Sequence, residues 1–203
     1  MPAIETVSGV YVDPENPDPE TLLINDMAWA LSRTARFAGA TITPVAYNNA
    51  QHSVFVASMI EKHINSVPIR LDKKSERDLI LFGLLHDCAE CYVGDVPSPI
   101  KRIPKLRTVF SEIEDKLLNI IFNKYVGHIP SEEEWHTVKY YDARACQIEA
   151  FVFMRSRGLT PQWGPRQNID LVELQSFSQP EQSVESYQKF IAKFSELSDD
   201  YLT

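Results

Sequence analysis

Apolar residues recur along most of this chain at spacings of three and four, the period that places them on one face of an α-helix. This pattern predicts six helices, whereas the apolar residues near Gly9 predict a short hairpin or an ordered arm. The positions that mark the six helices are Met27, Leu31 and Ala35; Phe55, Val56, Met59 and Ile60; Leu79, Phe82 and Leu85; Phe110, Ile113, Leu117 and Ile120; Val138, Tyr141, Ala145, Ile148 and Val152; and Val184, Tyr187, Ile191, Phe194 and Leu197. We therefore expect an all-α fold.

Polar residues and helix breakers predict where these helices begin and end. We expect the third helix to continue through His86 and Ala89, because its apolar pattern runs on to that point. The residues expected at helix starts are Asn25 or Asp26, Asn49, Ser75, Ser131 and Pro180, and the expected stops are Gly39, Gly94 and Gly158. No linker divides the chain, which predicts one domain over residues 1–203 with a core over 25–155 and a closing helix over 180–200.

Composition narrows the class of protein. The chain has 203 residues, 44% of them hydrophobic, which is enough for a sizeable core. The net charge of −8 disfavours binding to duplex nucleic acid, since such proteins usually carry a basic face. No apolar run approaches the roughly 18 residues of a membrane span, and no basic start with an apolar run marks a secretory signal, so we expect a cytosolic protein. The 3 cysteines are too few for a disulfide framework.

The chemistry-bearing segment lies at the end of the third predicted helix. His86 and Asp87 follow a strongly apolar stretch, where burial is costly unless both side chains have partners. A divalent cation would satisfy both, and His52 and Asp142 lie at inward-facing positions of two other predicted helices. Glu90, four residues after His86, is expected on the same helix face, within reach of a water at the metal. Two histidines and two aspartates suit Mn, Fe, Co, Ni or Zn equally.

The pattern His52 … His86-Asp87 … Asp142 resembles the signature of HD-domain metal-dependent phosphohydrolases, over roughly residues 25–155. The flanking sequence motifs are similar to those of a subgroup that contains bacterial 5′-deoxynucleotidases and phage dATP triphosphohydrolases. These motifs are Ala50-Gln51-His52-Ser53, His86-Asp87-x-x-Glu90 and Gly94-Asp95-Val96-Pro97-x-Pro99-x-Lys101. The resemblance implies an HD-domain helical bundle, a bound divalent metal with an option for a second Mg or Mn ion at the phosphates, and a homo-oligomer.

The same resemblance implies a role for each matching residue. The implied metal ligands are His52, His86, Asp87 and Asp142. Glu90 resembles the acidic residue that orients or deprotonates water, and Asp95 a supporting or proton-donating carboxylate. Arg36 and Phe37 resemble the pair that meets the substrate, although the nucleotidases tend to have tryptophan where this chain has Phe37. Lys101 resembles a lysine that contacts phosphate.

These observations leave three hypotheses for function. The lead is a dNTP triphosphohydrolase that favours dATP and releases deoxynucleoside and triphosphate; it rests on the compact length of the chain, on the similarity of the motif's surroundings to the phage enzymes, and on Lys101. The basic segment 101–107 could grip a polyphosphate or could be only a solvated helix start. The nearest alternative is a 5′-deoxynucleotidase that acts on dNMPs with the same site. The alternative from another class is a non-catalytic nucleotide-binding or partner module. His63, His128 and His136 are expected to be solvated, and Trp163 to be a packing residue.

Overall fold

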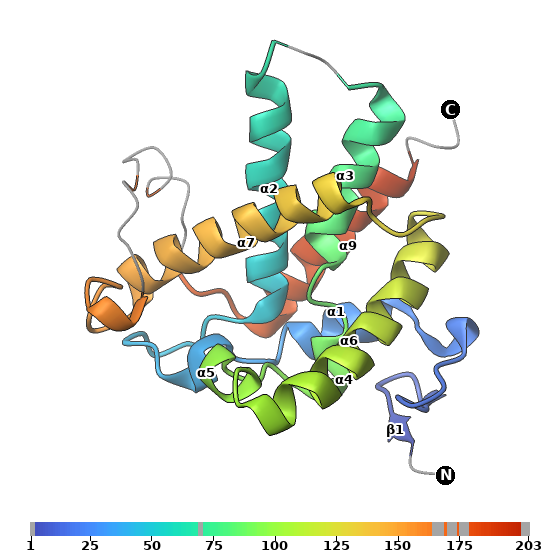
Figure 1. Ribbon diagram of the computed structural model, residues 1–203, viewed down its shortest axis with the longest axis horizontal. Helices are drawn as coiled ribbons and strands as arrows, with labels where there is room; N and C mark the ends of the chain where they lie inside the picture. Colours follow the sequence, from blue (N-terminus) through green and yellow to red (C-terminus); the bar gives the residue numbers. More distant parts are fainter. Residues whose placement is uncertain (1–2, 69–70, 164–168, 170–173, 175–178, 200–203) are drawn as a thin grey trace.

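The fold is built from α-helices, as the hydrophobic pattern predicts, with one two-stranded hairpin at the N-terminal end (Figure 1). The computed structural model describes residues 3–68, 71–163, 169, 174 and 179–199. The strands are β1 (Ile4–Glu5) and β2 (Tyr11–Val12), and the α-helices are α1 (Ile24–Leu31), α2 (Asn49–Ser66), α3 (Lys73–Leu85), α4 (Glu90–Val93), α5 (Ser98–Lys101), α6 (Pro104–Tyr125), α7 (Glu132–Phe153) and α9 (Ser183–Asp199). The described residues also form 3₁₀ turns, namely η1 (Pro19–Thr21), η2 (Arg36–Gly39) and η3 (Pro161–Trp163).

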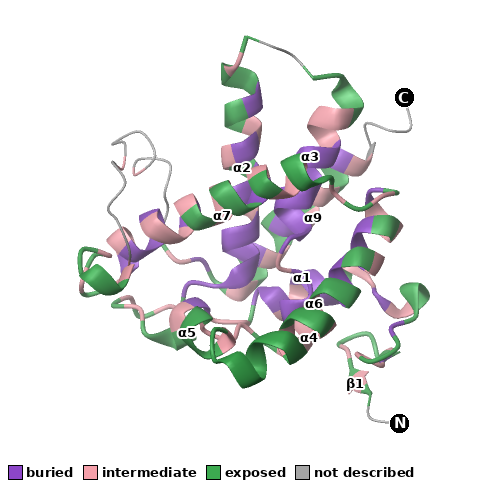
Figure 2. Ribbon diagram, in the orientation of Figure 1, coloured by how far each residue is buried: buried purple, intermediate pink, exposed green. Residues whose placement is uncertain are grey.

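The centre of the molecule is the contact between α2 and α3, which run side by side in opposite directions (Figure 1). Gly83 permits this close approach, since a Cβ atom there would lie 2.5 Å from Cδ1 of Ile60. Helix α7 crosses α2 and α3 on one side, and α9 packs against α1, α2 and α3. The buried residues gather where these helices meet (Figure 2). The expectation of an all-α fold with a short N-terminal hairpin is confirmed.

The hairpin turns at Gly9, whose φ of +81° is a conformation that glycine adopts without strain. Its strands pair Ile4 with Val12 in an antiparallel register. The hydroxyls of Thr6 and Ser8 both donate to the buried carboxylate of Asp26 in α1, each at 2.6 Å. These two bonds fasten the hairpin to the helical core.

The first predicted helix is shorter than its apolar pattern suggested. Helix α1 begins at Ile24 without a side-chain cap, so neither Asn25 nor Asp26 caps it, and it ends at Leu31 rather than continuing to Gly39. The hydroxyls of Ser32 and Thr34 bond to carbonyls of the last turn of α1, a local arrangement that competes with further helix. The chain then extends before it turns again in η2.

Two of the predicted helix caps are wrong by one to three residues. Asn48, rather than Asn49, caps α2 by accepting a hydrogen bond from the Gln51 amide at 3.0 Å, because the Asn49 side chain turns inward. Asp72, rather than Ser75, caps α3. The capping box of α7, between Ser131 and Glu134, is confirmed.

Helix α3 ends at Leu85, so the predicted continuation through His86 and Ala89 is wrong. Residues 86–89 form tight turns in which amides bond to carbonyls three residues back, as Glu90 N does to Asp87 O at 2.9 Å. Glu90 then opens the short helix α4. Glu90 and His86 therefore do not share one regular helix face.

The last helix begins at Ser183, slightly after the predicted Pro180. Of its predicted apolar residues, Tyr187, Ile191, Phe194 and Leu197 contact the core, whereas Val184 is exposed. Residue 200, the predicted end of the closing helix, lies outside the described residues, and the single-domain organisation over 1–203 stays a prediction. Within the described parts of the chain, every helix is too short or too polar to cross a bilayer.

Candidate metal centre

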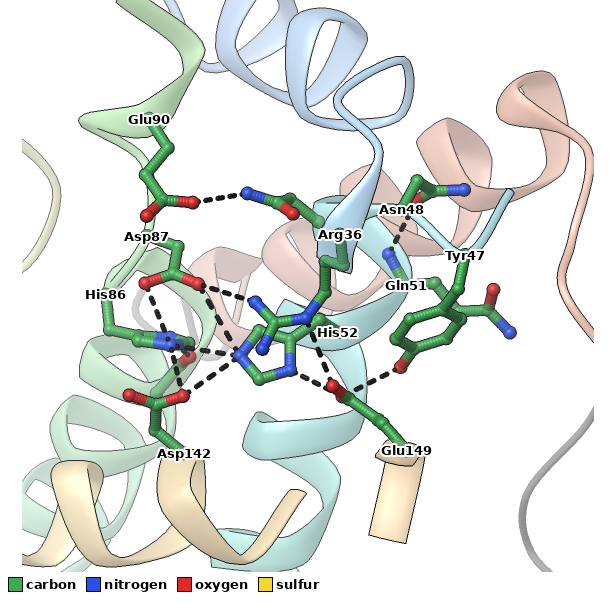
Figure 3. A network of polar contacts seen from close by, with 12 residues as sticks. Arg36, Tyr47, Asn48, Gln51, His52, His86, Asp87, Glu90, Asp142 and Glu149 are labelled. Atoms are coloured by element: carbon green, nitrogen blue, oxygen red, sulfur yellow. Dashed lines mark hydrogen bonds and ion pairs between the residues drawn. The ribbon is translucent and has the colours of Figure 1, made fainter. Parts of the chain in front are cut away.

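Three separate parts of the chain bring two imidazoles and two carboxylates together (Figure 3). His52 comes from the first turn of α2, His86 and Asp87 follow directly after α3, and Asp142 lies in the middle of α7. Nε2 of His52 lies 3.3 Å from Nε2 of His86 and 3.2 Å from Oδ1 of Asp142. Nε2 of His86 lies 3.1 Å from Oδ1 of Asp87. The four residues that the sequence singled out thus converge at one point.

The distances between these atoms fit the coordination sphere of a divalent cation. Two neighbouring ligand atoms that each lie about 2.0–2.2 Å from one cation are separated by roughly 2.8–3.6 Å in octahedral or tetrahedral geometry. The contacts of the two Nε2 atoms with each other and with both aspartates span 3.1–3.7 Å. Among the described residues, His52, His86 and Asp87 form a cluster whose ligand atoms all lie within 4.8 Å of one another. Asp142 joins this cluster through its contacts with both imidazoles.

The electrostatic field at this point favours positive charge. Burial lowers the pKa of His86, but the Asp87 and Asp142 carboxylates outweigh it and raise that pKa to about 10. Burial raises the pKa of Asp87, yet the His86 and His52 imidazoles hold it well below its usual range. The carboxylates therefore stay ionised, and the place where they meet the imidazoles attracts a cation.

The outward-facing nitrogen of each imidazole has an acceptor. Nδ1 of His86 donates to the carbonyl oxygen of Gly83 at 2.8 Å, and Nδ1 of His52 donates to Oε1 of Glu149 at 2.6 Å. The sequence analysis missed Glu149, which is fully buried in α7. Its position could have been inferred from the sequence, because it lies seven residues after Asp142 and therefore on the same face of that helix.

Glu90 lies beside this cluster but is held by other partners. Its carboxylate accepts hydrogen bonds from the side-chain amide of Asn49 and from Nζ of Lys101, the latter at 2.8 Å. Burial and the nearby carboxylates of Asp87 and Asp95 raise the pKa of Glu90 to about 8. Burial likewise raises the pKa of Asp95. Asn49 is a second residue that the sequence analysis missed, having been read as a helix cap.

Lys101 lies between two acidic side chains. Its Nζ is 2.8 Å from Glu90 and also 2.8 Å from Oε1 of Glu114 in α6. Its predicted contact with phosphate stays a prediction. Another lysine that the sequence did not single out, Lys139, lies 2.6 Å from Oδ2 of Asp142.

Arg36 and Phe37 lie next to the cluster, in η2. Nε of the buried Arg36 donates to Oε2 of Glu149 at 3.0 Å, and its Nη1 lies 3.4 Å from Oδ2 of Asp87. Phe37 has a φ of +55°, in the left-handed region that non-glycine residues rarely occupy, and its ring makes an edge contact with Trp163. Trp163 therefore packs against another aromatic ring, as expected. Strained backbone of this kind often gathers at functional sites.

Comparisons with known proteins agree with this geometry. The sequence profile described as 5′-deoxynucleotidase YfbR-like matches residues 27–142. An uncharacterized protein of Escherichia coli, YfdR, is 29% identical over 125 residues, which are 62% of this chain and 59% of the relative. An uncharacterized protein of Rhodobacter capsulatus is 30% identical over 111 residues, which are 55% of this chain and 52% of the relative. This chain thus matches little more than half the length of these curated relatives.

Among solved structures, the cyanophage S-2L HD phosphohydrolase (DatZ), bound to dA and one catalytic Zn²⁺ ion, matches with a TM-score of 0.48 and 17% identity. The match covers 86% of this chain and 95% of that one. The all-helical fold and the two-histidine, two-aspartate site define the class of HD-domain metal-dependent phosphohydrolases. The chain belongs to the YfbR-like 5′-deoxynucleotidase family.

Proposed function

We propose that this protein hydrolyses the 5′-phosphoester of deoxynucleoside monophosphates in a metal-dependent reaction. The observation that carries the proposal is the convergence of His52, His86, Asp87 and Asp142, with both Nε2 atoms turned toward the two carboxylates. The family match to 5′-deoxynucleotidases supports the choice of reaction. The assembled ligand set also favours an enzyme over the alternative of a non-catalytic module.

The four clustered side chains would hold the divalent cation. Mixed imidazole and carboxylate ligands suit Zn, Co, Mn, Ni or Fe, and the option of a second Mg or Mn at the phosphate stays a prediction. When bound, such a cation supplies Lewis-acid polarisation of a phosphoryl oxygen and makes water more acidic. The chain supplies the shape of the site, since the ligands come from three helical segments that pack firmly together.

The acidic residues beside the cluster are suited to handle protons. A carboxyl group with a pKa near neutrality can both accept and donate a proton at physiological pH. Burial gives Glu90 this property, and Asn49 and Lys101 hold its carboxylate in place. We assign Glu90 to orient or deprotonate the attacking water, and Asp95 to support it or to protonate the leaving 5′-oxygen.

Arg36 is the residue best placed to meet a phosphate. Its guanidinium keeps the charge that a phosphate needs, and Glu149 fixes one edge of it through Nε. We assign Phe37 to the nucleoside part of the substrate, because an aromatic ring offers a face or an edge to a base. The Trp163 contact holds that ring in position.

The local charge balance favours a monophosphate over a triphosphate. Lys101, which the sequence suggested as part of a polyphosphate grip, is committed to Glu90 and Glu114. Arg36 is partly neutralised by Glu149 and Asp87. A triphosphate carries more negative charge than Lys101 and Arg36 can balance while they form ion pairs with these acidic side chains. We therefore place the dNMP nucleotidase ahead of the dNTP triphosphohydrolase, the reverse of the order that the sequence favoured.

The triphosphohydrolase, with its preference for dATP, remains the second candidate because of one feature. Arg102, at the end of α5, and Lys105 and Arg107, in the first turn of α6, follow Lys101 in a chain whose net charge is −8. Lys105 and Arg107 are exposed, so a polyphosphate tail that leaves the site toward α6 would meet their positive charges. The predicted homo-oligomer and the cytosolic location stay predictions.

A substrate screen separates the two candidates. The purified protein is incubated with each dNMP and dNTP in the presence of Mn²⁺, Co²⁺ or Zn²⁺, and the products are resolved by anion-exchange chromatography. Release of inorganic phosphate from dNMPs supports the first candidate, and release of intact triphosphate from dNTPs supports the second. A variant that carries Arg102→Ala, Lys105→Ala and Arg107→Ala should keep dNMP hydrolysis and would lose rate only on dNTPs. Absence of both reactions with every metal would refute the proposed enzyme.

A further inference from the structure

We infer that Glu149 is the positioning residue that sets the tautomer of His52 and so keeps its Nε2 free to bind the cation. The inference rests on the proposed metal site and extends it to a residue without a direct ligand role. Glu149 is fully buried, and its carboxylate has three partners from two other segments of the chain (Figure 3). Oε1 accepts from Nδ1 of His52 at 2.6 Å and from the hydroxyl of Tyr47 at 3.1 Å, and Oε2 accepts from Nε of Arg36 at 3.0 Å.

The hydrogen bond between His52 and Glu149 runs in one direction only. An ionised carboxylate can only accept hydrogen bonds, so Nδ1 of His52 must carry the proton. In the neutral imidazole the other nitrogen, Nε2, then has a lone pair. That lone pair faces Nε2 of His86 and the carboxylates of Asp87 and Asp142, where the cation would lie.

The other tautomer of His52, with its proton on Nε2, is favoured by two nearby carboxylates. Nε2 of His52 lies 3.2 Å from Oδ1 of Asp142 and 3.5 Å from Oδ2 of Asp87. Without Glu149, these two carboxylates would favour a proton on Nε2, which is the nitrogen that must be unprotonated to bind metal. Glu149 opposes them from the far side of the ring. The tautomer of His52 therefore depends on which carboxylate attracts the proton more strongly, Glu149 at Nδ1 or Asp142 and Asp87 at Nε2.

His86 differs from His52, because a backbone carbonyl and not a side-chain carboxylate accepts the proton of its Nδ1. Nδ1 of His86 donates to the carbonyl of Gly83, in the last turn of α3, where helix carbonyls lack an intrahelical partner. His52 lies instead in the first turn of α2, and the carbonyl one turn before it, that of Asn48, already accepts the amide of His52. The acceptor for His52 is instead a side chain of another helix, Glu149 in α7.

The same carboxylate also fixes Arg36. Its bond to Nε leaves the other edge of the guanidinium turned toward Asp87. Glu149 thereby sets the relative position of one metal ligand and of the arginine assigned to phosphate. We expect the loss of Glu149 to lower the affinity for the metal through His52. We also expect it to lower the affinity for the substrate through Arg36, even when the metal is saturating.

The test measures metal binding rather than hydrolysis. Zn²⁺ affinity is determined by competition with a chromophoric chelator for the wild type, for Glu149→Gln and for Tyr47→Phe. Outer partners of metal-bound histidines typically contribute about 10- to 100-fold in affinity, and we expect a loss of that size for Glu149→Gln. Tyr47→Phe is the matched control, because it removes another bond to the same carboxylate and leaves His52 its acceptor. Its affinity should stay within about threefold of the wild type, as its bond does not touch the imidazole.

A spectroscopic measurement on the wild type makes the inference independent of how the variant folds. The chain has 5 histidines, so long-range ¹H–¹⁵N correlations of the Zn²⁺-loaded, ¹⁵N-histidine-labelled protein can be assigned. We expect His52 to show a proton on Nδ1 and zinc on Nε2. Coordination through Nδ1, or an unchanged Zn²⁺ affinity in a folded Glu149→Gln variant, would overturn the inference. Failure of the wild type to bind any divalent metal would instead refute the proposed function.

Discussion

Nε2 of His52 and Nε2 of His86 lie 3.3 Å apart, although 33 residues separate them in the sequence, and the Nδ1 atom of each ring has an acceptor on its other side. The carboxylates of Asp87 and Asp142 face the same pair of nitrogens and raise the pKa of His86, so positive charge is stabilised at this point. A divalent cation can take the place of the protons that the imidazoles hold here. Metal binding should therefore stabilise the folded protein.

We predict that saturating divalent metal raises the melting temperature and that Asp87→Ala removes this effect. At a concentration of 100 times Kd, binding to the folded state contributes about 2.7 kcal/mol, which for a chain of this size corresponds to roughly 5–10 °C. Scanning calorimetry with and without a chelator measures the shift. Asp115→Ala, which removes an exposed carboxylate of α6, is the control and should respond to metal as the wild type does. An equal metal response in Asp87→Ala would show that the ions bind elsewhere.

Replacement of Gly83 should disturb both the core and the site. A Cβ atom at this position would lie 2.5 Å from Cδ1 of Ile60, at the contact of α2 with α3. Gly83→Val forces these helices apart, and we expect a loss of about 1–3 kcal/mol in unfolding free energy, as for other overpacked cores. Urea denaturation measures it. Gly83→Ala should cost less, because the end of the Ile60 side chain can move aside. A valine variant as stable as the wild type would contradict the close approach.

Glu90 should reduce the stability of the metal-free protein at alkaline pH. Its folded-state pKa, about 8, lies above the unfolded value of about 4.3, so the folded chain holds a proton that the unfolded chain releases. The stabilising contribution is therefore complete below pH 4.3 and is lost as pH rises toward 8. Glu90→Gln cannot ionise, and its stability relative to the wild type should increase with pH over this range. Denaturation curves at several pH values, recorded with a chelator, give this difference. A difference that does not change with pH would show that Glu90 titrates normally.

A second pH effect lies far from the metal centre, at the start of α3. The buried carboxylate of Asp78 accepts hydrogen bonds from Lys74 at 2.7 Å and from Nε2 of His128 at 3.0 Å. His128 was expected to be solvated, but its side chain, although 41% exposed, is bonded to this carboxylate. The bond to Asp78 raises the pKa of His128.

Since the folded pKa of His128 is raised, its stabilising contribution is complete below the unfolded value of about 6.5 and is lost as pH rises through the folded value. We expect His128→Gln to lower the unfolding free energy at pH 5.5 by less than about 1 kcal/mol, because the pair is partly exposed, and by a smaller amount at pH 9. Urea denaturation at the two pH values tests this. His136→Gln, at an exposed position of α7, serves as the control. A loss that grows with pH would refute the bond to Asp78.

The sequence by itself determined six of the helices, though not the short α4 and α5, and it singled out the four residues of the candidate metal centre. Helical periodicity follows from local geometry, because side chains three and four residues apart share a face, and this property does not depend on the rest of the fold. The same rule placed His52 and Asp142 on inward faces. A histidine and an aspartate at the end of an apolar helix require partners when they are buried. His52 and Asp142 completed the set of two histidines and two aspartates that suits a metal.

The tertiary structure decided the residues that support the site. Glu149 and Asn49 look like ordinary polar residues of a helix, and their contacts with His52 and Glu90 exist only after α7 and α4 pack against α2. The tight turns after Leu85, which take Glu90 off the face of His86, are formed by backbone bonds between neighbouring residues that the apolar pattern did not predict. Periodicity reports which side of a helix faces inward, whereas the partner that a buried polar group finds there is set by the angle and the distance between helices.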